Sequence, residues 1–275
     1  MEGTSPWGAI SGANYRAILV GHVFVTTSRP VQPHSPNRHT PSAHSEGHAK
    51  VILRIADFNG SGELAAGNHA KQWTELQKAL KRMPLHIKAS DQAGLQGNPI
   101  FDPVGTNAYI KDKLEAIGWA SGIPIPTEYR FLGTDVDYGR NGVLVEVQFS
   151  NYPFLLNNTL RSELFFKSKT CLPQIGRTRL VVIVTKAHMF PSSNSTLYYE
   201  QAENQLSALA RNKVFDCPIR LVGLFGRKNA QVRVTFTEYH NPRYSRTVVK
   251  RETKQLRIAS GRSARSRCNL EIIPD

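Results

Sequence analysis

The segment Asp137–Gln148, with the sequence DYGRNGVLVEVQ, holds the side chains of this chain that are best placed to do chemistry. Its Asn141-Gly142 pair is a strong signal for a two-residue hairpin turn. The alternation of apolar and polar residues after the turn is typical of a strand, so Glu146 and Gln148 share one face. If Asp137 lies beside that face, two carboxylates converge on a divalent cation that can bind a phosphodiester and acidify water. The D…ExQ spacing is a loose motif, however, and on pattern alone a half-exposed strand with a wet face is the simpler interpretation.

Alternating helix and strand patterns surround this hairpin and predict an α/β sheet layered with helices. Apolar stripes predict four helices, at residues 73–83, 109–117, 158–167 and 198–211. Pro84 and Gly118 end the first two, and in the third we expect Leu160 and Leu164 to face the interior. Strands are predicted at 180–185, 219–224 and 231–236. The first is a nearly continuous apolar run, as in a central strand covered on both faces, and the second is predicted to be another buried strand.

Length and composition predict a globular protein with one large domain. The chain has 275 residues, 40% of them hydrophobic, and no apolar run approaches the length of a membrane span. Residues 1–50, rich in Pro, His and Ser toward their end, predict a disordered extension or a start codon placed too far upstream. The histidines there match no usual spacing of metal ligands. We expect a folded domain over 51–255 and a basic tail over 256–275.

The net charge of +14 favours a polyanion, above all nucleic acid, as the partner of this chain. A soluble protein that is merely basic is the alternative. Cys171, Cys217 and Cys268 lie far apart and form no CxxC unit, so neither a disulfide framework nor a zinc site is indicated. The apolar patch at 17–25 is too short and too poorly flanked for a signal peptide. We therefore expect a cytoplasmic protein.

Longer strings make the resemblance to one family specific. Residues from about 51 to 255 resemble the BglII-type type II restriction endonucleases. The strings that carry the resemblance include MPLHIKASDQA at 83–93, IFDPVGTN at 100–107, VEVQFSNYPFLLNN at 145–158 and PIRLVGL at 218–224. The resemblance implies a PD-(D/E)xK nuclease fold, with a mixed sheet flanked by helices and a smaller β-rich subdomain. It also implies a homodimer that cuts both strands of a palindromic DNA site with Mg²⁺.

The resemblance also implies roles for the hairpin. Asp137 and Glu146 match the metal-binding carboxylates, and Gln148 stands where most of this superfamily has lysine. We expect the two carboxylates and the main-chain carbonyl of Val147 to hold Mg²⁺, while Gln148 orients the attacking water. Because glutamine cannot act as a base at neutral pH, the proton acceptor stays open between bulk water and a neighbouring phosphate.

Other residues in the matching strings are expected to read bases or bind the DNA backbone. They are Ser150, Asn151, Arg161, Asn194, Ser195, Tyr244 and Arg246. Each has an ordinary alternative, such as a helix N-cap for Asn194 or a solvated helix position for Arg161. His188 is expected to be a hydrogen-bonded structural residue rather than a third metal ligand. Three residues of these strings have no assigned role: Lys88, Asp91 and Asp102.

The match around these positions favours a six-base palindrome centred on GATC, with AGATCT as the first expectation and 5′ overhangs as the product. A two-fold site requires a two-fold protein, and helices 158–167 and 198–211 are candidates to pack across the dimer axis. A cognate DNA methyltransferase is expected in the same cell. The alternatives are a repair or junction nuclease of the same fold, and a DNA-binding protein that has lost catalysis.

Overall fold

The computed structural model describes residues 51–193, 195–241, 246–263 and 265–274. The described residues belong to one compact unit, Glu46–Asp275. The predicted extension at 1–50 lies outside the described residues. Within the described ranges, no helix is long and apolar enough to cross a membrane.

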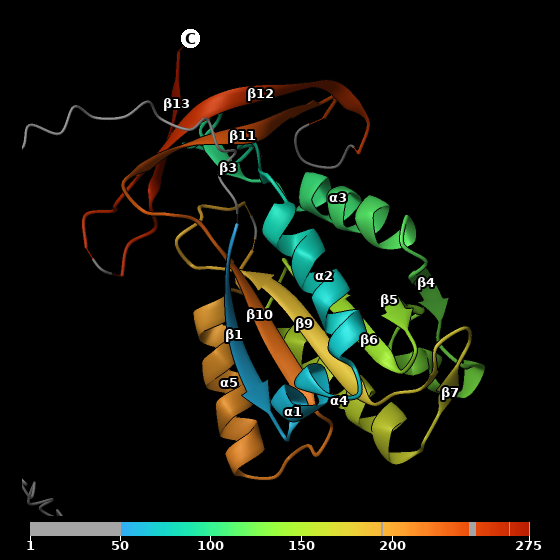
Figure 1. The fold of residues 1–275 in the computed structure, drawn as a ribbon. Coiled ribbons are helices and arrows are strands. Elements are labelled where there is room, and N and C mark those ends of the chain that lie inside the picture. Colours follow the sequence, from blue (N-terminus) through green and yellow to red (C-terminus); the bar gives the residue numbers. More distant parts are fainter. Residues whose placement is uncertain (1–50, 194, 242–245, 264, 275) are drawn as a thin grey trace, which may run out of the picture. The chain divides into compact units, whose positions relative to one another are not determined.

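A six-stranded mixed sheet forms the centre of the unit, in the order β1-β10-β9-β6-β5-β4 (Figure 1). Its strands are β1 (Ile52–Phe58), β4 (Ala120–Pro124), β5 (Asp135–Arg140), β6 (Val143–Val147), β9 (Leu180–Lys186) and β10 (Ile219–Phe225). The strands β6, β9 and β10 run parallel, and the other three run antiparallel to their neighbours. Every residue of the three parallel strands is buried, which confirms the prediction of covered central strands.

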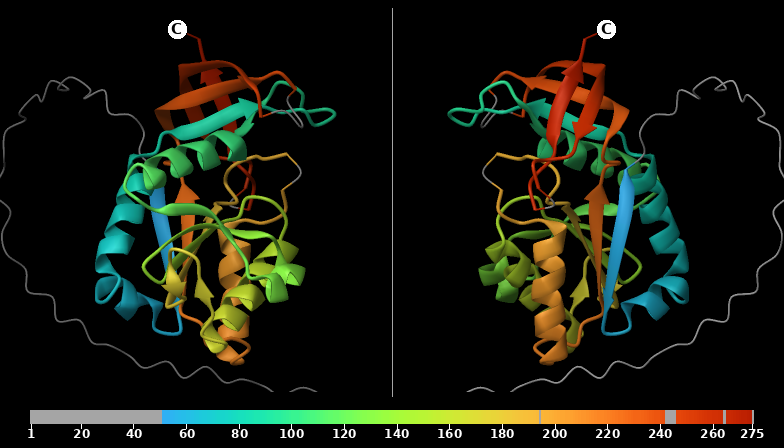
Figure 2. Two further views of the ribbon diagram at one scale, coloured as in Figure 1. Left: turned by 90° about the vertical axis from the view of Figure 1, so that its right-hand side faces the viewer. Right: turned by 90° about the vertical axis from the view of Figure 1, so that its left-hand side faces the viewer.

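Helices cover both faces of this sheet (Figure 2). One face carries α1 (Ser61–Ala66) and α2 (Ala70–Arg82), and the other carries α4 (Pro153–Lys167) and α5 (Tyr199–Arg211). A further helix, α3 (Pro103–Glu115), begins at Asp102, whose carboxylate accepts a hydrogen bond from the Val104 amide at 3.0 Å. The short 3-10 helix η1 (Thr127–Leu132) precedes β5. All four predicted helices are present.

A second, five-stranded sheet lies beyond the carboxyl ends of β9 and β10, in the order β13-β12-β11-β2-β3 (Figures 1 and 2). Its strands are β2 (Leu85–Ala89), β3 (Pro99–Phe101), β11 (Ala230–Tyr239), β12 (Val248–Ala259) and β13 (Asn269–Ile273), and a small hairpin of β7 (Cys171–Leu172) and β8 (Gly176–Arg177) stands apart. Asp102 joins the subdomain to α3, because its Oδ2 accepts a hydrogen bond from the Tyr239 hydroxyl at 2.8 Å. This sheet is the β-rich subdomain that the resemblance implies.

The structure differs from the expected domain division at the C-terminal end. The boundary between residues 255 and 256 falls inside β12, and β13 pairs with β12 through Leu256 and Ile272. Leu256 and Ile258 are buried, whereas Arg257 between them is exposed. The start of the segment expected to be a basic tail therefore alternates apolar residues inward with a basic residue outward, as a strand with one covered face does.

The prediction for the inward face of α4 is wrong. Leu160 is 53% exposed, and the buried side of the helix includes Leu155, Arg161 and Phe165. A pair of leucines four residues apart defines a helical stripe only when the neighbouring polar residues face solvent. Here several polar side chains of α4 face the interior instead, because they belong to the site described next.

Candidate active site

The β5–β6 hairpin places Asp137 opposite Glu146. Asn141 and Gly142 have φ of 47° and 80°, the left-handed conformations of a type I′ hairpin turn. Tyr138 pairs with Val145, and the same register carried one residue further sets Asp137 across from Glu146. The Oδ2 atom of Asp137 accepts a hydrogen bond from the Val147 amide at 2.7 Å, so the aspartate bridges the two strands.

Both carboxylates are withdrawn from water. Glu146 is only 4% exposed, so the interpretation of β6 as a half-exposed strand with a wet face is wrong. Burial raises the pKa of Glu146 to about 8, with the charge of Asp137 adding to the rise and Arg161 opposing it. Burial also raises the pKa of Asp137, and the neighbouring Asp135 adds to that rise. A buried acid beside a half-buried one is an environment in which a bound cation stabilises both ionised forms.

Arg161 of α4 supplies the counter-charge to Glu146. Its Nη2 lies 2.5 Å from Glu146 Oε1 and 3.2 Å from Asn158 Oδ1, and its Nη1 donates to the Leu132 carbonyl at 3.2 Å. At Gly133 an added Cβ would lie 2.5 Å from Nη1, so the absence of a side chain there makes room for the guanidinium. We expected this arginine to contact DNA; the structure pairs it with Glu146, because α4 turns a different face inward than predicted.

Gln148 follows β6 directly and is half-buried. Its Nε2 donates to Ser150 Oγ, and its Oε1 accepts from Asn158 Nδ2 at 3.5 Å. Asn158 therefore contacts both Arg161 and Gln148, and it links the guanidinium of Arg161 to the side-chain amide of Gln148. The pattern of the sequence did not single out this asparagine, although it ends one of the matching strings.

A buried lysine lies at the end of the neighbouring strand β9. Lys186 is 2% exposed, and its Nζ donates to Ser195 Oγ and to the carbonyls of Leu197 at 2.8 Å and Phe149 at 3.4 Å. Burial lowers the pKa of Lys186 to about 7, and the positive charge of Arg267 adds to the effect. The sequence offered one signal for this residue: a lysine directly after the nearly continuous apolar run at 180–185 is placed to be buried at the end of a central strand.

The lysine ties together the segments that follow β6 and β9. The amides of Thr196 and Leu197 both donate to the Ser150 carbonyl, at 3.1 and 3.0 Å. Ser150 and Asn151 are exposed next to Gln148, whereas the hydroxyl of Ser195 is bound to Lys186 and to main-chain carbonyls.

The remaining predicted DNA contacts lie elsewhere along the chain. Asn194 and Tyr244 are outside the described residues, and Arg246 is exposed just before β12. The structure thus brings the hairpin residues together with Ser150, Asn151 and Arg161. Arg246 lies apart from them in sequence, two residues before strand β12 of the five-stranded sheet.

The donor set of the hairpin suits Mg²⁺. In the part of the chain that the structure describes, no three His, Cys, Asp or Glu side chains gather as a metal site. Magnesium in nucleic-acid enzymes, however, is commonly held by one or two carboxylates, with water and substrate phosphate in the other positions. Asp137, Glu146 and the carbonyl of Val147 supply such a partial shell of hard oxygen ligands.

A mixed sheet flanked by helices, with two facing carboxylates on a β-hairpin and a glutamine just after it, defines a nuclease of the PD-(D/E)xK class. More narrowly, the chain belongs to the family described as restriction endonuclease BglII/BglIII, whose model matches residues 53–224. It is 54% identical over 201 residues to the type II restriction enzyme BglII of Bacillus subtilis, which covers 73% of this chain and 88% of that protein.

Two solved structures are similar to the fold. The crystal structure of BglII complexed with a DNA 16-mer matches with a TM-score of 0.77 and 49% identity, over 81% of this chain and 100% of that one. The crystal structure of free BglII matches with a TM-score of 0.63 and 45% identity, over the same shares of the two chains. The described conformation is therefore more similar to the DNA complex than to the free enzyme.

Proposed function

We propose that this chain is a Mg²⁺-dependent type II restriction endonuclease that cuts both strands of a short palindrome centred on GATC. AGATCT is the first expectation for the site, with 5′ overhangs as the product. The observation that carries the proposal is the pair of half-buried Asp137 on β5 and buried Glu146 on β6, which face each other across the hairpin, in a chain that is 54% identical to a type II restriction enzyme. The similarity to a DNA complex supports double-stranded DNA as the substrate.

Hydrolysis of a phosphodiester needs a positioned water and charge relief at the phosphate. When bound, Mg²⁺ supplies the charge relief and lowers the pKa of the attacking water. Asp137, Glu146 and the Val147 carbonyl would hold the ion, and the bond from the Val147 amide fixes the direction of the Asp137 carboxylate. Gln148, oriented by its own hydrogen bonds, aligns the water. Since its amide takes no proton at neutral pH, the proton goes to bulk water or to a neighbouring phosphate.

Arg161 is proposed to be a positioning residue in this scheme. Its guanidinium holds Glu146 and Asn158, and through Asn158 it is linked to Gln148. It also neutralises part of the charge that the two acids would otherwise place in a dry site. A direct contact from Arg161 to DNA would require the side chain to leave the ion pair with Glu146.

Sequence reading is assigned to the exposed residues at the same edge. Ser150 and Asn151 follow the catalytic strand, and the amide of an asparagine can make two hydrogen bonds to adenine in the major groove. Asn194, Tyr244 and Arg246 keep the DNA-contacting roles that their matching strings imply. For Ser195 we propose instead that its hydroxyl, bound to Lys186, sets the position of this loop.

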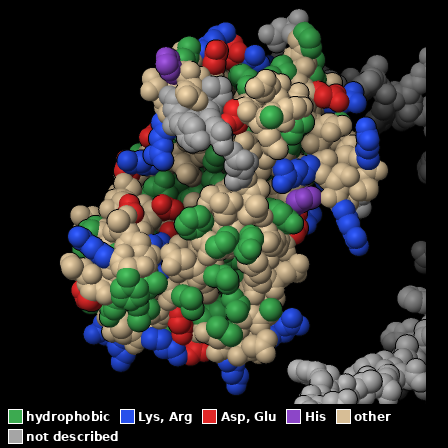
Figure 3. Space-filling model, turned by 180° about the vertical axis from the view of Figure 1, so that it is seen from behind, with side chains coloured by type: hydrophobic (Ala, Val, Ile, Leu, Met, Phe, Trp, Pro, Cys, Tyr) green, Lys and Arg blue, Asp and Glu red, His purple; other side chains and the backbone are tan. Residues whose placement is uncertain are grey.

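A second copy of the chain is the proposed partner across a palindromic site. Large apolar side chains at the start and along the outer surface of α4 are 39–53% exposed, and Figure 3 shows apolar side chains gathered on the face formed by α4 and α5; they are Tyr152, which precedes the helix, and Phe154, Leu156 and Leu160 within it. Such a patch is typical of an interface between subunits. A DNA methyltransferase that protects the host site is expected in the same cell, and we place both enzymes in the cytoplasm with the DNA.

The oligomeric state can be tested at this surface. Sedimentation of the wild-type chain should give a dimer, and Leu160→Glu should weaken its association at least about 100-fold because a charge is buried in an apolar interface. Val249→Glu, which places the same charge at an exposed valine of β12, is the matched control. A wild-type monomer at micromolar concentration, or equal dissociation in both variants, would contradict the assignment.

The function itself is tested by digesting phage DNA with the full chain in Mg²⁺ and sequencing the fragment ends. The proposal predicts one palindromic sequence at every cut, with staggered 5′ ends. A continuous ladder, or a preference for branched DNA, would indicate a repair or junction nuclease. Retarded DNA that stays intact in Mg²⁺ would indicate a binding protein without catalysis.

A further inference from the structure

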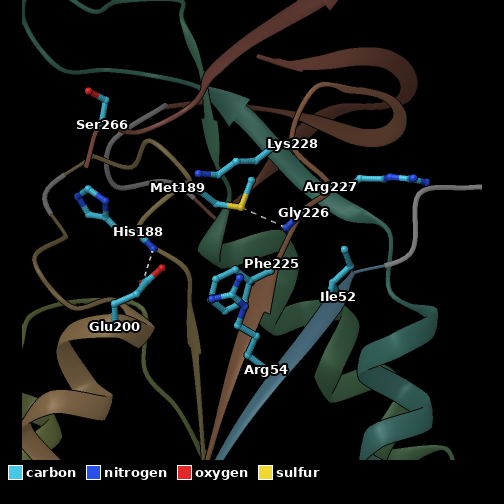
Figure 4. Close-up of a pocket in the computed structure, with 10 residues that line it drawn as sticks. All are labelled: Ile52, Arg54, His188, Met189, Glu200, Phe225, Gly226, Arg227, Lys228 and Ser266. Carbon is cyan, nitrogen blue, oxygen red and sulfur yellow. Dashed lines mark hydrogen bonds between the residues drawn. The ribbon is translucent and has the colours of Figure 1, made fainter. Parts of the chain in front are cut away.

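A second polar pocket lies at the same edge of the large sheet as the active site. It has a volume of about 360 Å³ and is lined by residues at the ends of β1, β9 and β10 (Figure 4). Because β6, β9 and β10 run parallel, their carboxyl ends meet at one edge. With neighbouring strands about 4.8 Å apart, β10 is roughly 10 Å and β1 roughly 15 Å from the catalytic strand β6.

Cations dominate the lining of this pocket. The guanidinium of Arg54 lies 4.3 Å from the centroid of the Phe225 ring, and this contact holds it in place at the pocket wall. Figure 4 shows Lys228 extended toward the side where His188 stands, and Arg227 pointing the other way. No carboxylate of the described residues forms an ion pair with Arg54 or Lys228.

The field in the pocket is positive despite one acid. Glu200 is the one carboxylate among the described lining residues, and its Oε2 accepts a hydrogen bond from the His188 amide at 2.9 Å. That bond ties the carboxylate to the main chain. Burial lowers the pKa of His188, and the nearby positive charge of Arg267 lowers it further. Glu200 raises it by less than Arg267 lowers it, and Lys186 and Lys228 add smaller downward effects.

We propose that this pocket binds a phosphate of the DNA backbone outside the recognised base pairs, through Arg54 and Lys228. The inference rests on the proposed function, since it takes DNA as the substrate. A duplex carries a phosphate about every 3.4 Å along each strand, so DNA that runs along this edge of the sheet would bring to the pocket, roughly 10–15 Å from β6, a phosphate a few nucleotides from the one that is cut. The contact carries no sequence information; it adds affinity and fixes the register of the duplex across the sheet edge.

The test is the salt dependence of DNA binding by the full chain, with Ca²⁺ in place of Mg²⁺ so that binding is measured without cutting. The double variant Arg54→Gln/Lys228→Gln should bind a 24-base-pair duplex that carries the cut site about tenfold or more weakly than wild type. The slope of log K against log salt should fall by about one. Both side chains are exposed, so the fold should be retained.

Two controls separate the pocket from general charge. Arg227→Gln removes one cation from the residue next to Lys228, but from a side chain that points away, and it should keep the wild-type slope. On a duplex truncated to two base pairs beyond the site, wild type and double variant should bind alike. An unchanged slope in the double variant, or an equal loss in Arg227→Gln, overturns the pocket while a cutting wild type leaves the proposed function standing. A wild type that neither binds nor cuts DNA overturns both.

Discussion

Two buried charges lie at the ends of neighbouring strands, and the protein holds them in opposite ways. Glu146, at the end of β6, faces a second acid, Asp137, and one guanidinium, that of Arg161. Lys186, at the end of β9, is surrounded by neutral acceptors, namely two main-chain carbonyls and the hydroxyl of Ser195. Burial shifts both groups toward neutrality, with the pKa of Glu146 raised to about 8 and that of Lys186 lowered to about 7.

The difference means that Glu146 can exchange its charged partner, whereas Lys186 cannot exchange its main-chain partners without movement of the backbone. The charge on Glu146 is balanced by a side chain, and a metal ion can take over that balance without moving the main chain. The bonds of Lys186 end on the backbone of Phe149 and Leu197, so their loss must move the loops themselves. The first is therefore the place that we propose for chemistry, and the second joins the segment after β6 to the loop that follows β9.

The strongest way to break this comparison is to remove a charge from the hairpin. Asp137→Asn or Glu146→Gln should lower single-turnover cleavage of a cognate duplex by about 10³-fold or more, because the ion loses a ligand worth several kcal/mol in the transition state. The melting temperature of Asp137→Asn should stay close to that of wild type, since the amide oxygen can still accept the hydrogen bond from the Val147 amide. Asp135→Asn, at an exposed acid of the same strand, is the control and should stay within a few-fold of wild type.

Lys186→Met tests whether this lysine positions the loops that follow β6 and β9, because it removes the hydrogen bonds to the carbonyls of Phe149 and Leu197. Cleavage of the cognate site should fall about 10- to 100-fold through misplacement of the loops, and the preference over sites with one changed base should shrink. The unfolding free energy should drop by about 2 kcal/mol because several buried acceptors lose their donor. Lys250→Met, at an exposed lysine of β12, should change stability by less than about 0.5 kcal/mol. A Lys186→Met enzyme with wild-type rate and selectivity would show that the hydrogen bonds of Lys186 do not position the loops for cleavage.

The pH dependence of stability sharpens the contrast, because the two groups give opposite signs. The pKa of Glu146 is about 8 in the folded protein, above its usual 4.5. The folded state therefore binds the proton more tightly, and its stability falls as pH rises from about 5 to 8. Lys186, with a pKa of about 7 against 10.5, makes stability rise between about pH 7 and 10. Urea unfolding without metal should show Glu146→Gln gaining about 1–3 kcal/mol on wild type between pH 5 and 8. Parallel pH curves would show that Glu146 does not titrate in this range.

The smallest effect is expected at the turn that joins β5 and β6. Asn141 has a φ of 47°, and Asn141→Ala should cost about 1 kcal/mol of stability because alanine tolerates the left-handed region poorly. Asn141→Gly should be nearly neutral. Both variants should cut DNA within a few-fold of wild type, since the register of the hairpin is also held by β9. A large loss of cleavage in Asn141→Ala alone would show that the turn, rather than the sheet, positions the acids.

The sequence determined the hairpin and the central strands well, because Asn-Gly turns and fully apolar strand runs are local signals. Sequence patterns failed to predict whether a polar residue is exposed or buried where both environments fit the same pattern. Arg161 has the same pattern on a solvated helix as in a buried ion pair, and only the packing of α4 on the sheet decides between them. Lys186 looks like the polar end of a strand, and the carbonyls that it binds come from segments 37 and 11 residues away along the chain. In the C-terminal strands the many basic residues obscured an alternation that starts at Leu256.

Anomalous diffraction from a complex with cognate DNA and Mn²⁺, a substitute for Mg²⁺ with a strong signal, examines the hairpin itself. A metal peak should lie roughly 2.1 Å from a carboxylate oxygen of both Asp137 and Glu146, beside the scissile phosphate. A peak that touches neither acid, or a phosphate bound there with no metal while Glu146 stays paired only with Arg161, would contradict the catalytic role given to this pair.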